Sequence, residues 1–175
     1  MCRHHSKYLP SMSWIVSWIL LSLAAGKYTA VSSFSSRTCT GTPEVLVFVA
    51  GDSCAPIPCG QDPSSSGEFI QVECVEEDWE TFSLTKFVNA SAPIIVQQIY
   101  SELGCQGARR DVIATLSGLC QAGTNHTLQS DGSLLIQRIP GCTGEPTSSF
   151  VLPADGSCRL VTKYSVMEPN QKAAL

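Results

Sequence analysis

One segment of the chain, residues 105–120, reads CQGARRDVIATLSGLC and shows the pattern that we expect to decide the fold. Its two cysteines are 15 positions apart. The interval recurs three more times, at Cys39–Cys54 and Cys59–Cys74 (15 positions each) and at Cys142–Cys158 (16 positions). Recurrence at a fixed spacing is typical of a repeated structural unit. The sequence therefore predicts a small fold built from a repeated, cysteine-framed segment.

Glycines accompany these cysteines in recurring places. Three segments open as C-x-G, at Cys39, Cys105 and Cys142, and two close as G-x-C, at Cys120 and Cys158. The segment between Cys59 and Cys74 lacks the C-x-G opening. The spacing leaves the pairing open, because each segment could close its own loop or neighbouring segments could be cross-linked.

The first 26 residues have the composition of a secretory signal peptide. Arg3 and Lys7 precede an uncharged run, WIVSWILLSLAA (14–25), and Gly26 follows two alanines. This run is shorter than the roughly 20 apolar residues that a membrane-spanning helix needs, and small residues suit a cleavage site. We predict cleavage after Gly26 and secretion of an extracellular chain; an uncleaved membrane anchor is the alternative.

Cleavage would remove Cys2 and leave an even number of cysteines in the exported chain. Even counts in exported proteins predict disulfides, because the oxidising route lets them persist. His126 is the only histidine beyond residue 26, and no cysteine pair has C-x2-C spacing, so the sequence does not indicate a zinc site. The predicted disulfide cysteines are Cys39, Cys54, Cys59, Cys74, Cys105, Cys120, Cys142 and Cys158.

The charge balance excludes one class of partner. Loss of Arg3 and Lys7 with the leader leaves nine basic against 15 acidic side chains, a net charge of −6. A chain without a positive surplus cannot neutralise nucleic-acid phosphates. We therefore expect no nucleic-acid partner. We also expect no transmembrane helix in the exported chain.

The hydrophobic pattern predicts a mainly β fold. VLVFVA (45–50) is a continuous apolar run, expected to form a central strand buried on both faces. Asp131-Gly132 and Asp155-Gly156 are typical of tight hairpin turns. Further strands are expected at residues 69–75, 93–100, 134–139 and 159–166, with loops at 55–58 and 63–67.

One short helix is expected near residues 77–87. Trp79, Phe82 and Phe87 are spaced for one helical face, and acidic residues stand where a helix N-terminus favours them. We therefore expect a small, disulfide-stapled antiparallel β domain with one helix. The expected organisation is a signal peptide (1–26), a flexible N-terminal linker (27–37), the cysteine-rich domain with its internal C-x-G…C repeats (38–166) and a C-terminal tail (167–175).

Candidate catalytic and metal-binding patterns are incomplete. Gly51-Asp52-Ser53 resembles the first block of GDSL-type esterases, in which such a serine is the nucleophile, but that family needs an Asp-x-x-His base and Gly123 stands three places before His126. The acidic run 76–80 lacks the spacing of a calcium loop, so a helix start is the better interpretation. There is no nucleotide- or cofactor-binding motif. The sequence indicates a protein that is not an enzyme and that needs no cofactor.

Two N-x-[ST] sequons matter in an exported chain. They are Asn89-Ala90-Ser91 and Asn125-His126-Thr127. Glycans on Asn89 and Asn125 would mark surface positions.

A wider resemblance covers residues 39–158. Its pieces are CTGTP (39–43), the Cys54/Cys59 pair, Cys74 followed by acids and Phe82, residues 93–100 before Gly104-Cys105, and Asp131-Gly132-Ser133 before Gly141-Cys142. Together they resemble the cysteine-rich extracellular domains of oomycete secreted proteins and of receptor kinases of the tyrosine-kinase-like group. The resemblance implies a sensing or adhesive ectodomain, without the transmembrane helix and kinase of the receptor form.

These observations favour a secreted, non-enzymatic recognition or structural module that binds an extracellular protein or glycan. One alternative is a secreted effector or protease inhibitor acting through the proline-rich loop 55–58. The other alternative is an esterase that uses Ser53.

Overall fold

The computed structural model describes residues 28–51, 53–63 and 67–169, so the predicted signal peptide lies outside the described residues. The described chain folds into strands with one α-helix, α1 (Trp79–Lys86). The strands are β1 (Tyr28–Phe34), β2 (Val45–Ala50), β3 (Ile57–Gln61), β4 (Phe69–Val75), β5 (Ile94–Glu102), β6 (Gln106–Leu116), β7 (Cys120–Gln121), β8 (Thr124–Leu128), β9 (Ser133–Arg138), β10 (Ser148–Pro153), β11 (Cys158–Arg159) and β12 (Thr162–Met167). The described chain also forms two short 3-10 turns, η1 (Leu103–Cys105) and η2 (Pro140–Cys142).

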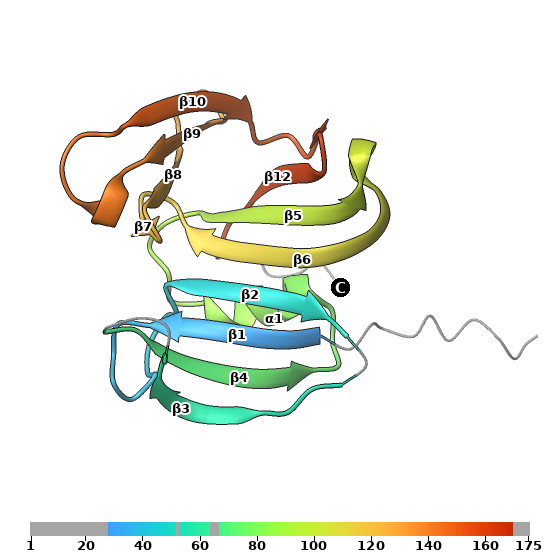
Figure 1. The fold of residues 1–175 in the computed structure, drawn as a ribbon, viewed down its shortest axis with the longest axis vertical. Coiled ribbons are helices and arrows are strands. Elements are labelled where there is room, and N and C mark those ends of the chain that lie inside the picture. Colours follow the sequence, from blue (N-terminus) through green and yellow to red (C-terminus); the bar gives the residue numbers. More distant parts are fainter. Residues whose placement is uncertain (1–27, 52, 64–66, 170–175) are drawn as a thin grey trace, which may run out of the picture.

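The strands form two antiparallel sheets (Figure 1). The larger sheet has eight strands in the order β11-β12-β5-β6-β2-β1-β4-β3. The smaller has four strands in the order β10-β9-β8-β7. The predicted fold class, a mainly β domain with one short helix and disulfide staples, is confirmed.

The two faces of the larger sheet bury different cores. Ile94 and Val96 pack with Phe48, Trp79 and other residues in a core on the side of α1. Ile95 belongs to a second core with Leu134 and Ile136 of the smaller sheet and Val166 of β12. Because successive strand residues point to opposite faces, the smaller sheet covers the β5–β12 part of the larger sheet on the face opposite α1.

The predicted helix is confirmed, and its first residue is fixed by a side-chain cap. Asp78 accepts hydrogen bonds from the backbone nitrogen of Thr81 (2.8 Å) and from its hydroxyl (2.7 Å). Burial by itself raises the pKa of Asp78, but these hydrogen bonds outweigh it and hold the pKa below its ordinary value of 3.8. The helix buries Trp79 and Ser83, and Lys86 in its last turn pairs with Glu73 of β4.

The strand at 45–50 is confirmed, but its predicted burial on both faces is wrong. Leu46 and Phe48 are fully buried on the α1 side. On the other face burial decreases along the strand, and Val49 is 43% exposed. The reason is that the smaller sheet covers only part of that face.

The prediction of a flexible linker at 27–37 is wrong. β1 lies inside the larger sheet, between β2 and β4. Its sequence, YTAVSSF, is only weakly hydrophobic, yet Ala30, Ser32 and Phe34 are buried on one face. Small side chains suit a strand that lies between two others and under a helix, so hydrophobicity alone does not reveal it.

Two predicted loop and turn assignments also need correction. The loop at 55–58 ends early, because β3 begins at Ile57 and pairs with β4. The turn at Asp155-Gly156 connects β10 of the smaller sheet to β11 of the larger one, so it is not a hairpin. Asp131-Gly132 does join the hairpin strands β8 and β9, and Gly132 has φ 81°.

Several strand boundaries differ from those expected. The strand expected at 159–166 is divided into β11 and β12 by a turn at Leu160, and Met167, assigned to the tail, ends β12. The remaining predicted strands correspond to β4, β5 and β9 within a few residues. The strands β6, β7 and β8 were not predicted, because they are rich in polar and charged residues. β10 was not predicted either, although Phe150, Val151 and Leu152 are apolar.

All eight predicted disulfide cysteines are paired. The bonds are Cys39–Cys59, Cys54–Cys74, Cys105–Cys158 and Cys120–Cys142. None of them closes one of the segments whose cysteines are 15 or 16 positions apart. Of the two alternatives left open by the spacing, cross-linking of neighbouring segments is therefore the correct one.

The cysteine repeat corresponds to three four-stranded units. Each unit has four strands, and the first in spatial order is a short edge strand that carries a cysteine. A second cysteine lies in the turn between the third and the fourth strand. A disulfide joins this turn to the edge strand. In spatial order, the first unit is β3-β4-β1-β2, the second unit is β11-β12-β5-β6, and the third unit is β7-β8-β9-β10. The larger sheet contains the first and second units, joined by β2 and β6.

The second and third units are interleaved along the chain. In the first unit, the hairpin β3–β4 follows β1–β2 and pairs with it. If the second repeat followed the same rule, the hairpin β7–β8 would pair with β5–β6. Instead, β8 pairs with β9, and β12 of the later hairpin β11–β12 pairs with β5. The two repeats thus exchange their second hairpins, which explains why Cys105–Cys158 spans 53 positions.

The C-x-G openings form one recurring backbone turn. The cysteines Cys39, Cys105 and Cys142 have φ values of 48°, 56° and 56°. The glycines two places later have φ values of 92°, 71° and 83°. Positive φ is costly for a residue with a Cβ and easy for glycine, so the turn needs the glycine and the disulfide holds the strained cysteine.

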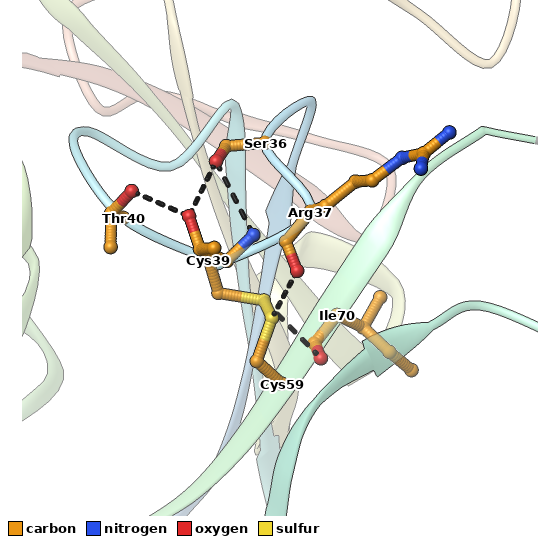
Figure 2. The surroundings of a disulfide bond; sticks show 7 residues. Ser36, Arg37, Cys39, Thr40, Cys59 and Ile70 are labelled. Carbon is orange, nitrogen blue, oxygen red and sulfur yellow. Dashed lines mark hydrogen bonds between the residues drawn. A yellow bond between two sulfur atoms is a disulfide. The ribbon is translucent and has the colours of Figure 1, made fainter.

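Figure 2 shows the first of these disulfides. The hydroxyl of Thr38 lies 3.0 Å from that of Ser36 and 2.9 Å from that of Thr40, and Cys39 donates its backbone N–H to the carbonyl of Ser36 (3.1 Å). The Cys59 sulfur contacts the carbonyl oxygen of Arg37 at 3.4 Å. The turn is therefore held by local hydrogen bonds as well as by its disulfide.

The exchange can be tested by mapping the disulfides. Proteolysis of the disulfide-intact protein without reductant, followed by mass spectrometry, should give the pairs Cys105–Cys158 and Cys120–Cys142 rather than Cys105–Cys120 and Cys142–Cys158. Removing the longest link, by Cys105→Ala/Cys158→Ala, should cost about 4 kcal/mol of unfolding free energy in the chain-entropy account. Recovery of the two local pairs would contradict the interleaved topology.

The Asp78 cap provides a second test. Asp78→Ala should lower the free energy of unfolding by about 1 kcal/mol, because the N–H of Thr81 loses its acceptor. Asp78→Asn keeps a capping oxygen and should stay close to the parent protein. Chemical denaturation of the three proteins at neutral pH measures the difference; equal stability of all three would show that the cap contributes nothing.

Candidate functional site

An open groove of about 570 Å³ lies between the first and third units. The first unit contributes two acidic residues, Glu44 and Glu68, and the third unit contributes Arg138 and two turns. The turn residues in the lining are Cys120, Gln121, Ala122, Gly123, Pro140, Gly141 and Cys142. The groove is therefore lined by two acidic residues on one side and by an arginine and two turns on the other.

The acidic side is positioned by strand ends. Glu44 immediately precedes β2; its backbone nitrogen donates to the carbonyl of Ser33 (2.8 Å), and its carbonyl accepts from the Thr115 hydroxyl (3.4 Å). Glu68 immediately precedes β4, and one of its carboxylate oxygens accepts from the Ser33 hydroxyl at 3.5 Å. Ser33 thus holds the backbone of Glu44 and the carboxylate of Glu68 from the strand between them.

The opposite side is formed by two turns of the third unit that the Cys120–Cys142 disulfide connects. The β7–β8 hairpin turns at Ala122 (φ 47°) and Gly123 (φ 76°). The carbonyl of Gly123 accepts from the nitrogen of Ile139 at 2.8 Å, and Cys120–Cys142 ties the same two turns together. A Cβ at position 123 would lie 3.4 Å from the Ile139 carbonyl oxygen, so this wall is closely packed backbone.

This arrangement is suited to binding. Carboxylates and a guanidinium form charge-assisted hydrogen bonds with polar partners. The two cysteines in the lining are oxidised, so neither can act as a thiolate nucleophile. Across the described ranges, no group of three or more histidine, cysteine, aspartate or glutamate side chains is arranged to hold a metal ion.

The structure does not bring Ser53 and His126 together. Ser53 is exposed beyond the end of β2, where Ala50 pairs with Tyr28. His126 lies near the opposite end of β2. The end of β6 pairs with the start of β2 at Val45, and Gly118, just past the end of β6, donates its N–H to the His126 carbonyl at 2.8 Å. The adjacent Asp52 lies outside the described residues.

His126 faces the second core rather than the groove. It pairs with Ile136 across β8 and β9, and its ring centroid lies 6.2 Å from that of Tyr164. Burial lowers the pKa of His126 below its ordinary value of 6.5 and raises that of Tyr164 above 10.0. The imidazole is therefore kept neutral between the sheets.

The two sequons differ in exposure, because Asn89 is exposed and Asn125 is half-buried. Asn89 is exposed in the turn after α1. Asn125 alternates with His126 along β8, so its side chain points to the outer face of the smaller sheet. The Thr127 hydroxyl lies 3.4 Å from the Asn125 side-chain oxygen, on the same face.

One polar cluster could not be found from the sequence. Arg109 donates to the hydroxyl of Tyr28 (2.8 Å) and to the side-chain oxygen of Gln98 (3.2 Å), and its guanidinium lies 5.4 Å from the ring of Trp79. A register shift between β5 and β6 beside Tyr100 sets the face on which Arg109 lies. The cluster ties three strands to α1, a structural role that no local motif signals.

Comparison with known protein families, characterised proteins and solved structures gave no match. The resemblance to oomycete secreted proteins and receptor ectodomains stays a prediction. α1, the one α-helix in the described ranges, is too short to span a bilayer.

Neutral His126 predicts a pH-dependent stability. Because its folded pKa is lowered, its contribution is fully present above the unfolded pKa of about 6.5 and is lost as the pH falls toward the folded pKa. The melting temperature should fall between about pH 7 and pH 5, and His126→Phe should reduce this fall. Calorimetry of both proteins across this range measures the effect; identical pH profiles would show that His126 does not contribute.

Proposed function

We propose that this chain is a secreted, non-enzymatic recognition module that uses the groove between its first and third units. The observation that carries the proposal is the construction of the groove. Each side rests on a disulfide-bonded unit, and its polar groups stand on strand ends and tight turns. Disulfides persist in oxidising extracellular environments, and binding groups are commonly presented on loops held by a rigid scaffold.

The groove chemistry favours a protein partner over a glycan. Glu44 and Glu68 place two carboxylates on one side, and carboxylates bind lysine and arginine side chains through charge-assisted hydrogen bonds. A partner segment with a basic residue would meet these acids, and its backbone could hydrogen-bond to the turns at Gly123 and Gly141. We therefore infer that the ligand is a basic segment of an extracellular protein.

Glycosylation belongs to the same proposal. Asn89 is exposed, and Asn125 is half-buried with its side chain pointing away from the second core. Glycans at these positions would leave the interior undisturbed, as surface sequons in an exported protein require.

A secreted inhibitor is a second candidate, supported by one observation. Residues 55–58 lie between Cys54 and Cys59, and these two cysteines are bonded to different parts of the first unit. Ile57 in this segment is half exposed. An extended segment fixed at both ends and presenting an apolar side chain has the form of an inhibitory loop, and a protease panel would test it.

Peptide display on the disulfide-intact protein tests the groove. We expect enrichment of peptides with lysine or arginine, and Glu44→Gln/Glu68→Gln should weaken their binding at least tenfold, because one charge-assisted hydrogen bond contributes about 1.5–3 kcal/mol. Glu77→Gln/Glu80→Gln removes the same charge from the exposed start of α1 and should leave binding unchanged. Peptides without a basic preference, or equal losses in both variants, would rule out the groove.

A further inference from the structure

The outer edge of β10 has no strand beside it in the described chain. β10 is the edge strand of the smaller sheet and pairs only with β9. Its sequence, SSFVLP, has no charged residue, and Phe150 and Val151 are 51% and 55% exposed. Alternation along the strand places these two side chains on opposite faces, so both faces of the edge present apolar surface.

The other sheet edges are protected against strand addition. β3 contains Pro58 and an irregular register against β4, while β7 and β11 are only two residues long. Short strands, proline and bulges are the devices by which proteins block open edges. β10 has six residues in a continuous register with β9 and only a terminal proline, Pro153. It is the one edge among these four that remains suitable for pairing.

The molecule already contains the contact that this edge would make. β2, β6 and β10 are the fourth strands of the first, second and third units. β2 and β6 pair with each other in antiparallel register from Val45–Thr115 to Val49–Asp111, which joins two units into one eight-stranded sheet. The fourth strand of the third unit has no such partner in the described chain.

We propose that β10 pairs in antiparallel fashion with β10 of a second copy of this chain. The dimer would repeat the β2–β6 junction between two third units and form a second eight-stranded sheet. An antiparallel contact of a strand with its own copy is compatible with twofold symmetry, the commonest symmetry of homo-oligomers. The absence of charge on β10 means that the symmetry brings no like charges together on this strand.

Measurement of molar mass by light scattering, over a range of concentrations, tests the proposal on the disulfide-intact secreted protein. We expect a dimer that dissociates on dilution. Phe150→Lys/Val151→Lys should raise the dissociation constant at least about tenfold, because charge on an edge opposes pairing. Val88→Lys/Leu103→Lys changes two similarly exposed apolar residues away from β10 and should leave the dimer unchanged.

Hydrogen exchange gives a readout that needs no variant. Amides of residues 148–152 should exchange more slowly in concentrated than in dilute protein, and those of β3 should not change. If the double lysine variant fails to form its four disulfides, Val151→Lys alone replaces it. A monomer mass at every concentration, or a dimer that persists in the β10 variants, would overturn the proposal. Pairing of β10 with a strand of another protein, in place of a second copy, would overturn it as well.

Discussion

The link between a strained turn and a short edge strand is the constraint on which this fold depends. Cys39, Cys105 and Cys142 each adopt positive φ, which a residue with a Cβ avoids. In each case the disulfide fixes that residue to the edge strand on the other side of the same four-stranded unit. The bond therefore closes each four-stranded unit across its width, where strands as short as β7 and β11 could contribute little by themselves.

Repetition of this unit explains how a chain with modest cores makes two large sheets. The first and second units share one sheet and the core under α1, while the third unit packs on the opposite face. The third unit covers only part of that face, which leaves Val49 partly exposed. The groove arises where this partial cover ends, between Glu44 and the β7–β8 turn.

The sequence was informative wherever one local property determined the structure. Apolar strands such as β2 and β4, the capped helix and the even set of cysteines followed from composition and spacing. β1 and β8 were not recognisable, because YTAVSSF and TNHTL are stabilised by strands on both sides rather than by hydrophobicity. The groove could not be predicted either, since Glu44 and Arg138 come together only through the packing of separate units. The exchange of hairpins has no signal in the spacing, because local and exchanged pairing use the same cysteines.

The interleaving of the last two repeats has a consequence for how the molecule assembles as the chain is synthesised. The first unit has all its strands by Val75 and can close while the remainder is still being synthesised. The second unit starts at Ile94 but lacks its second hairpin until the chain has been made as far as Met167. During that interval Cys105 lacks its partner Cys158 while Cys120 and Cys142 have already been made, so exchange of any premature Cys105 bond must precede formation of the native pairs.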